Sequence, residues 1–152
     1  MATGAYTKSA WIRRAAGANS NNVLSGNSGG GNHVFWATST NGFSISAGHS
    51  GPAFNQVQDP NPLVVGTWYH IAVTYDPAVA AGEMLLYTDG VEVDIATGIT
   101  VHGTTGNTYI GAYDGSNEIV GMLDEVRLST IARSADWILT EYNNQSSPST
   151  FL

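Results

Sequence analysis

The residues of this sequence best suited to bind a ligand are aromatic side chains that lie close to hydrogen-bonding polar groups. An aromatic ring can stack on the C–H face of a sugar, while amide, imidazole and carboxylate groups can hydrogen-bond its hydroxyls. The candidate ligand-binding residues are Trp36, His49, Asn55, Tyr113, Asp114 and Asn117. The alternative for Trp36 is a place in the core, and the alternative for His49 is a turn or the surface.

A second candidate is a carboxylate in the last long alternating run, Ile119–Ser129. In a strand, alternate residues share a face, so Asp124 is expected on the same face as Val126 and Leu128, toward the core. A buried carboxylate is costly unless backbone donors or a cation compensate it. Asp124 is therefore a candidate metal ligand, and the alternative is that it accepts hydrogen bonds from turn amides without a metal.

These side chains must be positioned by strands, and the central ones are predicted between Trp68 and Ile95. From Trp68 to Tyr75, β-branched and aromatic residues alternate with smaller or polar ones, which is typical of a half-buried strand. Asp76-Pro77 ends this strand, and a second is expected at Glu83–Thr88. Asp89-Gly90 then predicts a tight hairpin into Val91–Ile95. Three consecutive strands indicate the middle of an antiparallel sheet.

Short strands separated by glycine-rich turns are predicted along the rest of the chain. The expected segments are Lys8–Arg14, Asn22–Ser25, His33–Ala37, Gly42–Ala47, Phe54–Gln58, Ile99–His102, Thr108–Ala112 and Ile119–Ser129. A helix follows them at Arg133–Tyr142, capped by Ser134 and ended by Asn143-Asn144 and the Ser-Ser-Pro run after them. This order predicts one domain over residues 1–152, an all-β antiparallel sandwich of two sheets with one short C-terminal helix.

Composition and charge exclude several classes of protein. The 152 residues carry a formal charge of -7, which repels phosphate backbones, so no nucleic-acid partner is expected. The absence of cysteine excludes disulfides and thiolate sites. No apolar run approaches the ~20 residues of a membrane span, so no membrane insertion is expected. Residues 1–18 also lack the apolar segment of a signal peptide.

Four motifs in order give the sequence a family resemblance. They are Trp68-Tyr-His-Ile-Ala-Val-Thr-Tyr-Asp, Leu86-Tyr-Thr-Asp-Gly, Tyr109-Ile-Gly and Gly121-Met-Leu-Asp-Glu-Val-Arg-Leu. Together with Ser9-Ala-Trp-Ile, they resemble the laminin G-like domain over Ser9 to Tyr142. The resemblance implies a concanavalin A-like jelly roll of two curved antiparallel sheets, as in pentraxins, legume lectins and laminarinase-type glucanases. Little precedes Tyr6, where family members often carry a further strand, so one sheet edge is expected to be completed differently or by a partner.

The resemblance also bears on catalysis and on metal binding. Glucanase relatives use two carboxylates on one strand, and retaining hydrolysis needs them about 5–5.5 Å apart. Glu92-Val-Asp94 is the nearest match, but no second Glu follows it, and Asp124-Glu125 should point to opposite faces of a strand. The sequence therefore predicts that the domain is not an enzyme. In laminarinase-type relatives, an Asp on the last strand binds a structural calcium, so the resemblance implies Ca²⁺ at Asp124, with carbonyls from glycine turns as further ligands.

Two functional hypotheses follow. The first is a non-catalytic recognition module, carbohydrate-binding or adhesive, of a secreted or surface-exposed protein, with a glycan or a protein surface as its partner. The second is a structural or assembly protein, such as a surface-layer or virion component, which acts through contacts between subunits.

Overall fold

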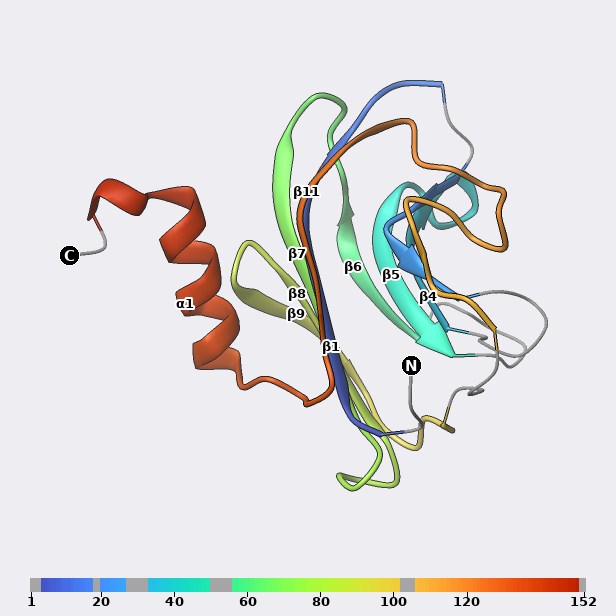
Figure 1. Cartoon of the computed structure of the whole chain (residues 1–152), viewed down its shortest axis with the longest axis vertical. Coiled ribbons are helices and arrows are strands. Elements are labelled where there is room, and N and C mark those ends of the chain that lie inside the picture. The colour runs from blue at the N-terminus through green and yellow to red at the C-terminus, as the bar shows by residue number, and fades with distance from the viewer. Residues whose placement is uncertain (1–3, 18–19, 27–32, 50–55, 102–105, 151–152) are drawn as a thin grey trace.

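The chain folds into two antiparallel β-sheets that face each other, with a helix on the outer side of the larger sheet (Figure 1). The computed structural model describes residues 4–17, 20–26, 33–49, 56–101 and 106–150. The predicted all-β sandwich with a C-terminal helix is confirmed within these ranges. No helix among the described residues is long and apolar enough to cross a membrane.

The larger sheet has five strands and carries the helix. Its order is β11 (Gly121–Ser129), β1 (Tyr6–Arg14), β7 (Trp68–Asp76), β8 (Glu83–Thr88) and β9 (Val91–Ala96). The hairpin between β8 and β9 turns at Asp89 and Gly90, which have φ values of 51° and 78°. Positive φ at both turn residues is what a type I′ hairpin requires, so the predicted Asp-Gly turn is confirmed.

The smaller sheet has four strands. Their order is β2 (Ser20–Asn22), β4 (His33–Thr38), β5 (Ser44–His49) and β6 (Val57–Pro62), and a separate pair joins β3 (Leu24–Ser25) to β10 (Tyr109–Ile110). The Asp59–Pro62 segment is part of β6, and an edge strand tolerates proline because one side needs no ladder donors. The strand predicted at Ile99–His102 is wrong for residues 99–101, and His102 lies outside the described residues.

The core lies between the two sheets and follows the predicted alternation of the central strand. Ile71, Val73 and Tyr75 of β7 are completely buried against residues of the smaller sheet such as Phe35 and Ile45. Ala72 points the other way and is buried under the helix with Tyr87 and Ile138. One strand therefore supplies both the sandwich core and the platform for the helix.

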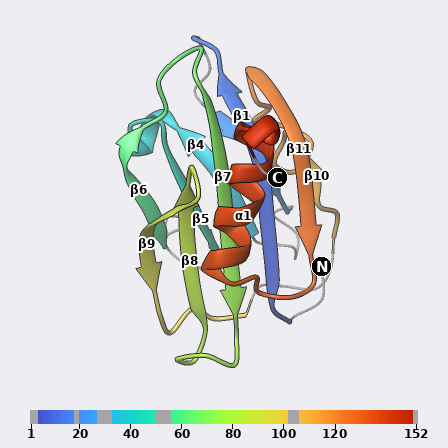
Figure 2. The same ribbon diagram turned by 90° about the vertical axis from the view of Figure 1, so that its left-hand side faces the viewer.

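The helix α1 (Ala135–Ser146) runs across the outer face of the larger sheet (Figure 2). Ser134 caps it by accepting a hydrogen bond from the amide of Trp137, at 3.3 Å. The helix continues through Asn143 and Asn144, because asparagine is only weakly unfavourable inside a helix. It ends at Ser146, in the Ser-Ser-Pro run that was also predicted to end it. The 3₁₀ turn η2 (Pro148–Thr150) follows, and a second one, η1 (Ser39–Asn41), joins β4 to β5.

A β-bulge in β11 overturns the predicted orientation of Asp124. Trp11 pairs with Asp124 and Ser9 pairs with Arg127, so β11 has one extra residue between these pairs, and Glu125 has a φ of 49°. The bulge brings Leu123 and Val126, rather than every second residue, against the core. Asp124 is consequently exposed, and the prediction that it lies on the core face is wrong.

A buried lysine completes the core of the sandwich. The Lys8 side chain is fully buried, and its Nζ lies 3.0 Å from the Leu24 carbonyl and 2.6 Å from Nδ1 of His33. Burial lowers the pKa of Lys8 well below its usual value. The amine is therefore expected to be neutral in the folded protein, so that it can donate to the imidazole without a buried charge.

This arrangement predicts a pH dependence of stability. An unfolded lysine has a pKa of about 10.4, so between the lowered folded pKa and that value the unfolded chain binds one more proton, and stability should rise with pH. In Lys8→Met the free energy of unfolding should rise less steeply as the pH approaches the unfolded pKa of about 10.4 from below, by up to about 1.4 kcal/mol per pH unit. Urea titrations at several pH values measure this difference. Equal slopes for the two proteins would show that Lys8 stays protonated in the fold.

Candidate functional site

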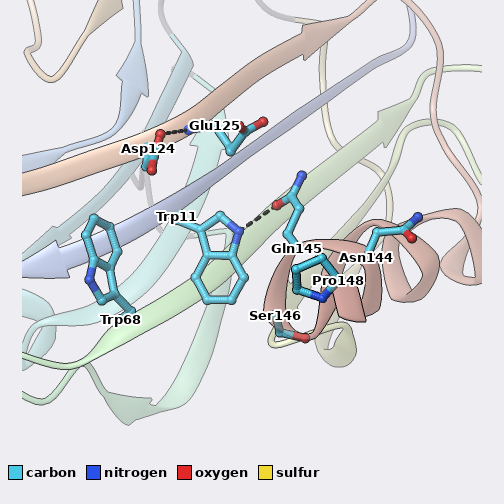
Figure 3. A pocket seen from close by; sticks show the side chains of 8 residues that line it. All are labelled: Trp11, Trp68, Asp124, Glu125, Asn144, Gln145, Ser146 and Pro148. Carbon is cyan, nitrogen blue, oxygen red and sulfur yellow. Dashed lines mark hydrogen bonds between the residues drawn. The ribbon is translucent and has the colours of Figure 1, made fainter. Parts of the chain in front are cut away.

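A cleft lies between the outer face of the larger sheet and the C-terminal end of α1 (Figure 3). It has a volume of about 600 Å³. Its walls carry two indoles, two carboxylates and two amides, from Trp11, Trp68, Asp124, Glu125, Asn144 and Gln145. These groups are of the kinds that bind sugars, although none of them belongs to the predicted ligand-binding set, and Asp124 was predicted only as a metal ligand.

The two tryptophans share one face because their strands are neighbours. Trp11 of β1 pairs with His70 of β7, and Trp68 pairs with Arg13, so both indoles project from the outer face of the sheet. Trp11 is held in place by its Nε1, which donates to Oε1 of Gln145 at 2.5 Å. Trp68 is 39% exposed and forms the open side of the cleft.

The bulge in β11 brings two consecutive carboxylates to the cleft. A regular strand would send Asp124 and Glu125 to opposite faces, as predicted, but here both line the same cleft, and that prediction is wrong. Glu125 forms an ion pair with Arg127. Asp124 accepts a hydrogen bond from the amide of Glu125 at 2.8 Å, and no cationic side chain of the described residues lies within ion-pair distance of it.

The helical wall of the cleft is attached to the sheet by a buried carboxylate. Glu141 is 5% exposed, its Oε1 lies 2.7 Å from Arg127, and its Oε2 lies 3.5 Å from Nε2 of His70. Burial alone would raise the pKa of Glu141, but contacts with His70, Ser9 and Arg127 hold this pKa below its usual value. The ionised carboxylate thus links α1 to both β7 and β11.

Four of the sequence-predicted residues lie elsewhere, along the smaller sheet. Trp36 of β4 is half-buried and pairs with Asn22, whose side-chain amide donates to the carbonyl of Asn117 at 2.8 Å. The loop that carries Tyr113, Asp114 and Asn117 is therefore linked to the strand of Trp36 through one residue. Burial and the Asp114 charge raise the pKa of Tyr113. A ligand-binding role for these four residues stays a prediction.

The other two predicted residues do not join this group. His49 is fully buried, with Nε2 at 2.8 Å from the Tyr6 hydroxyl and Nδ1 at 2.7 Å from the Thr100 carbonyl. It also packs edge-on against Tyr75, at 4.5 Å between ring centres. The structure thus places His49 in the core rather than at a ligand-binding rim or in a turn. Asn55 lies outside the described residues.

The described residues do not fit the buried calcium site that the resemblance implies. Asp124 is exposed, and no group of three or more His, Cys, Asp or Glu residues is placed to hold a metal ion within the described ranges. The expected burial of Asp124 therefore no longer argues for a cation at this residue. Calcium binding at Asp124, with backbone carbonyls as further ligands, stays a prediction.

The carboxylates suggested by the glucanase pattern are also separated. A register shift in β9 pairs Glu92 with Tyr87 of the outer face, but Asp94 with Leu86 of the core face. Glu92 and Asp94 therefore do not share a face. Of the two cleft carboxylates, Glu125 forms an ion pair with Arg127.

Sequence reasoning missed the cleft although one signal was present. Trp11 and Trp68 both fall opposite the apolar positions of their strands, which marks them as outer-face aromatics. The missing information was that β1 and β7 are neighbours, a pairing between segments far apart in the chain. The helical wall could not be placed without it.

Comparisons with known proteins agree on the fold. The family model described as "Concanavalin A-like lectin/glucanases superfamily" matches residues 1–139. A Bacteroides ovatus protein described as carbohydrate-binding superposes with a TM-score of 0.73 and 21% identity, over 90% of this chain and 40% of its own. The chain thus spans less than half of that protein. No protein of curated function matches the sequence.

Two further solved structures share this architecture. Domain 4 of the extracellular arabinanase AbnA from Geobacillus stearothermophilus, solved with arabinotriose, gives a TM-score of 0.68 and 18% identity, over 90% of this chain and 66% of its own. A heptameric pentraxin from Limulus polyphemus gives a TM-score of 0.64 and 15% identity, over 91% of this chain and 71% of its own. At these identities the likeness shows the fold alone.

The Glu141 contacts predict how firmly the helical wall is attached. Glu141→Gln should destabilise the protein by about 2 kcal/mol, because it removes the charge of a buried, hydrogen-bonded carboxylate. The midpoint temperature of thermal unfolding should fall by about 5 °C at neutral pH. The matched control is Glu125→Gln, which removes the exposed partner of the same arginine and should cost less than about 1 kcal/mol.

The same pair of variants gives a pH test. Because the folded pKa of Glu141 lies below its unfolded value of about 4.3, the stabilisation is complete above that pH and is lost as pH falls through the folded pKa. The difference between wild type and Glu141→Gln should therefore shrink in acid. If Glu125→Gln destabilises as much as Glu141→Gln, the buried carboxylate is not the main attachment of the helix.

Proposed function

The chain belongs to the concanavalin A-like lectin/glucanases superfamily, and from that premise we propose that it is a non-catalytic module that binds carbohydrate. The glycan occupies the cleft between α1 and the larger sheet. Because the chain spans only part of the Bacteroides ovatus and arabinanase chains that it resembles, the module acts as one part of a secreted or surface-exposed protein.

The observation that carries this proposal is the pair of tryptophans in the cleft. Trp68 offers an accessible ring, and Trp11 is fixed next to it by Gln145, so the aromatic surface is in place before a ligand arrives. Side chains held in their bound conformation lower the entropic cost of binding. Asn144 and Asp124 are then available for the hydroxyls of a stacked sugar.

The proteins of similar fold support carbohydrate as the ligand class. One is described as carbohydrate-binding, and the arabinanase domain was solved with an arabinose trisaccharide. The separation of Glu92 from Asp94 and the ion pair of Glu125 support recognition without hydrolysis. Trp36 with the loop of Tyr113 and Asn117 remains the competing location for a glycan.

The location can be tested with matched tryptophan variants. Trp68→Ala should weaken binding of the best glycan from an array by about thirtyfold, because truncating a tryptophan anchor commonly costs about 2 kcal/mol. Trp36→Ala is the control and should bind as tightly as wild type. Titration calorimetry measures both, and circular dichroism confirms that both variants fold.

Each other outcome has a definite meaning. Loss of binding in Trp36→Ala but not in Trp68→Ala would move the ligand to the smaller sheet and refute the cleft. If no glycan binds wild type and the protein forms a stable oligomer in solution, the module is not a lectin and the structural alternative is favoured. Release of reducing sugar from the bound glycan would contradict the non-catalytic assignment.

A further inference from the structure

We propose that the preferred ligand of the cleft carries a protonated amino sugar, and that Asp124 binds its ammonium group. This inference rests on the proposed function and makes it more specific, since it names the chemical class of the sugar. It depends on three features of the cleft: an uncompensated carboxylate, aromatic rings next to it, and a lining without basic side chains.

Asp124 is the carboxylate of the cleft that has no cationic partner. Glu125, which lies next to it, forms an ion pair with Arg127, and Glu141 behind the cleft contacts Arg127 and His70. Asp124 accepts a single hydrogen bond in the described structure, from the amide of Glu125 to its Oδ1. Its second oxygen is therefore available to a donor supplied by the ligand.

The position of Asp124 suits a cation above an aromatic surface. Asp124 pairs directly with Trp11 across the strands, and Figure 3 shows it lining the same cleft as the two indole rings. The face of an indole attracts a cation through the ring quadrupole, and tryptophan does so better than the other aromatic side chains. A sugar that stacks on these rings can thus place a charged substituent between an indole and a carboxylate.

The two arginines near the cleft already have hydrogen-bond or ion-pair partners within the chain. Arg13 pairs with Trp68, but its Nε donates to the Gly66 carbonyl at 2.8 Å and it lines a separate hollow. Arg127 is held by its two glutamates. The cleft is consequently negative, in a chain of formal charge -7, so acidic sugars should be repelled and cationic ones attracted.

The proposal distinguishes sugars that differ only in their charge. A glucosamine oligomer carries ammonium groups, whereas its N-acetylated form and a glucose oligomer of equal length are neutral. At mildly acidic pH and low salt, the glucosamine oligomer should bind wild type at least tenfold more tightly than either neutral oligomer. The preference should decrease as the amine loses its proton at higher pH and as salt screens the charges.

Single substitutions assign the preference to a residue. Asp124→Asn keeps the size of the side chain but removes its charge, and it should abolish the preference, so that charged and neutral oligomers bind the variant with equal affinity. Asp136→Asn is the matched control, because it removes an equal charge from an exposed position at the other end of α1. Trp68→Ala should weaken all three oligomers, since it removes the shared stacking surface.

The outcomes separate this inference from the function on which it rests. One outcome is that wild type binds charged and neutral oligomers with equal affinity, while Trp68→Ala weakens the binding of both. This result would overturn the amino-sugar assignment and leave the carbohydrate cleft in place. An equal loss of preference in Asp136→Asn would attribute it to net charge and overturn the role of Asp124. Absence of binding to any oligomer and to a glycan array would overturn both proposals.

Discussion

The attachment of α1 to the outer face of the larger sheet is the constraint on which the cleft depends. Its apolar part is small and centres on Ala72, Tyr87 and Ile138. The polar part is a buried carboxylate, Glu141, which contacts β7 through His70 and β11 through Arg127. Because a buried charge is tolerated only with close partners, this contact fixes the position of the helix along both strands as well as holding it down.

Departures from regular strand geometry create the chemistry of the site. The extra residue at Glu125 turns two consecutive carboxylates toward one cleft, and the shift in β9 separates Glu92 from Asp94. Bulges often re-aim side chains next to functional sites. The larger sheet thus gains a binding surface at one edge and loses a possible pair of catalytic carboxylates at the other. The regular strands between them keep the core closed.

Most of the fold could be predicted from the sequence because it follows from local patterns. The alternation in Trp68–Tyr75, the Asp89-Gly90 turn and the cap at Ser134 each act over a few residues. The site could not be predicted in the same way. His49 looked like a polar turn residue because its partner, Tyr6, lies far away in the sequence, and the bulge at Glu125 arises from pairing with β1. Sequence periodicity alone gives no sign of either.

The two walls of the cleft are held in place by different contacts. Trp11 and Asp124 stand on paired strands, where ladder hydrogen bonds hold the backbone, so their separation is set by the fold. Asn144 and Gln145 lie in the last turns of α1, beyond the Glu141 contact, and are tied to the sheet through Trp11. Specificity is best supplied by the fixed wall, since a group held in place distinguishes ligands by charge and geometry.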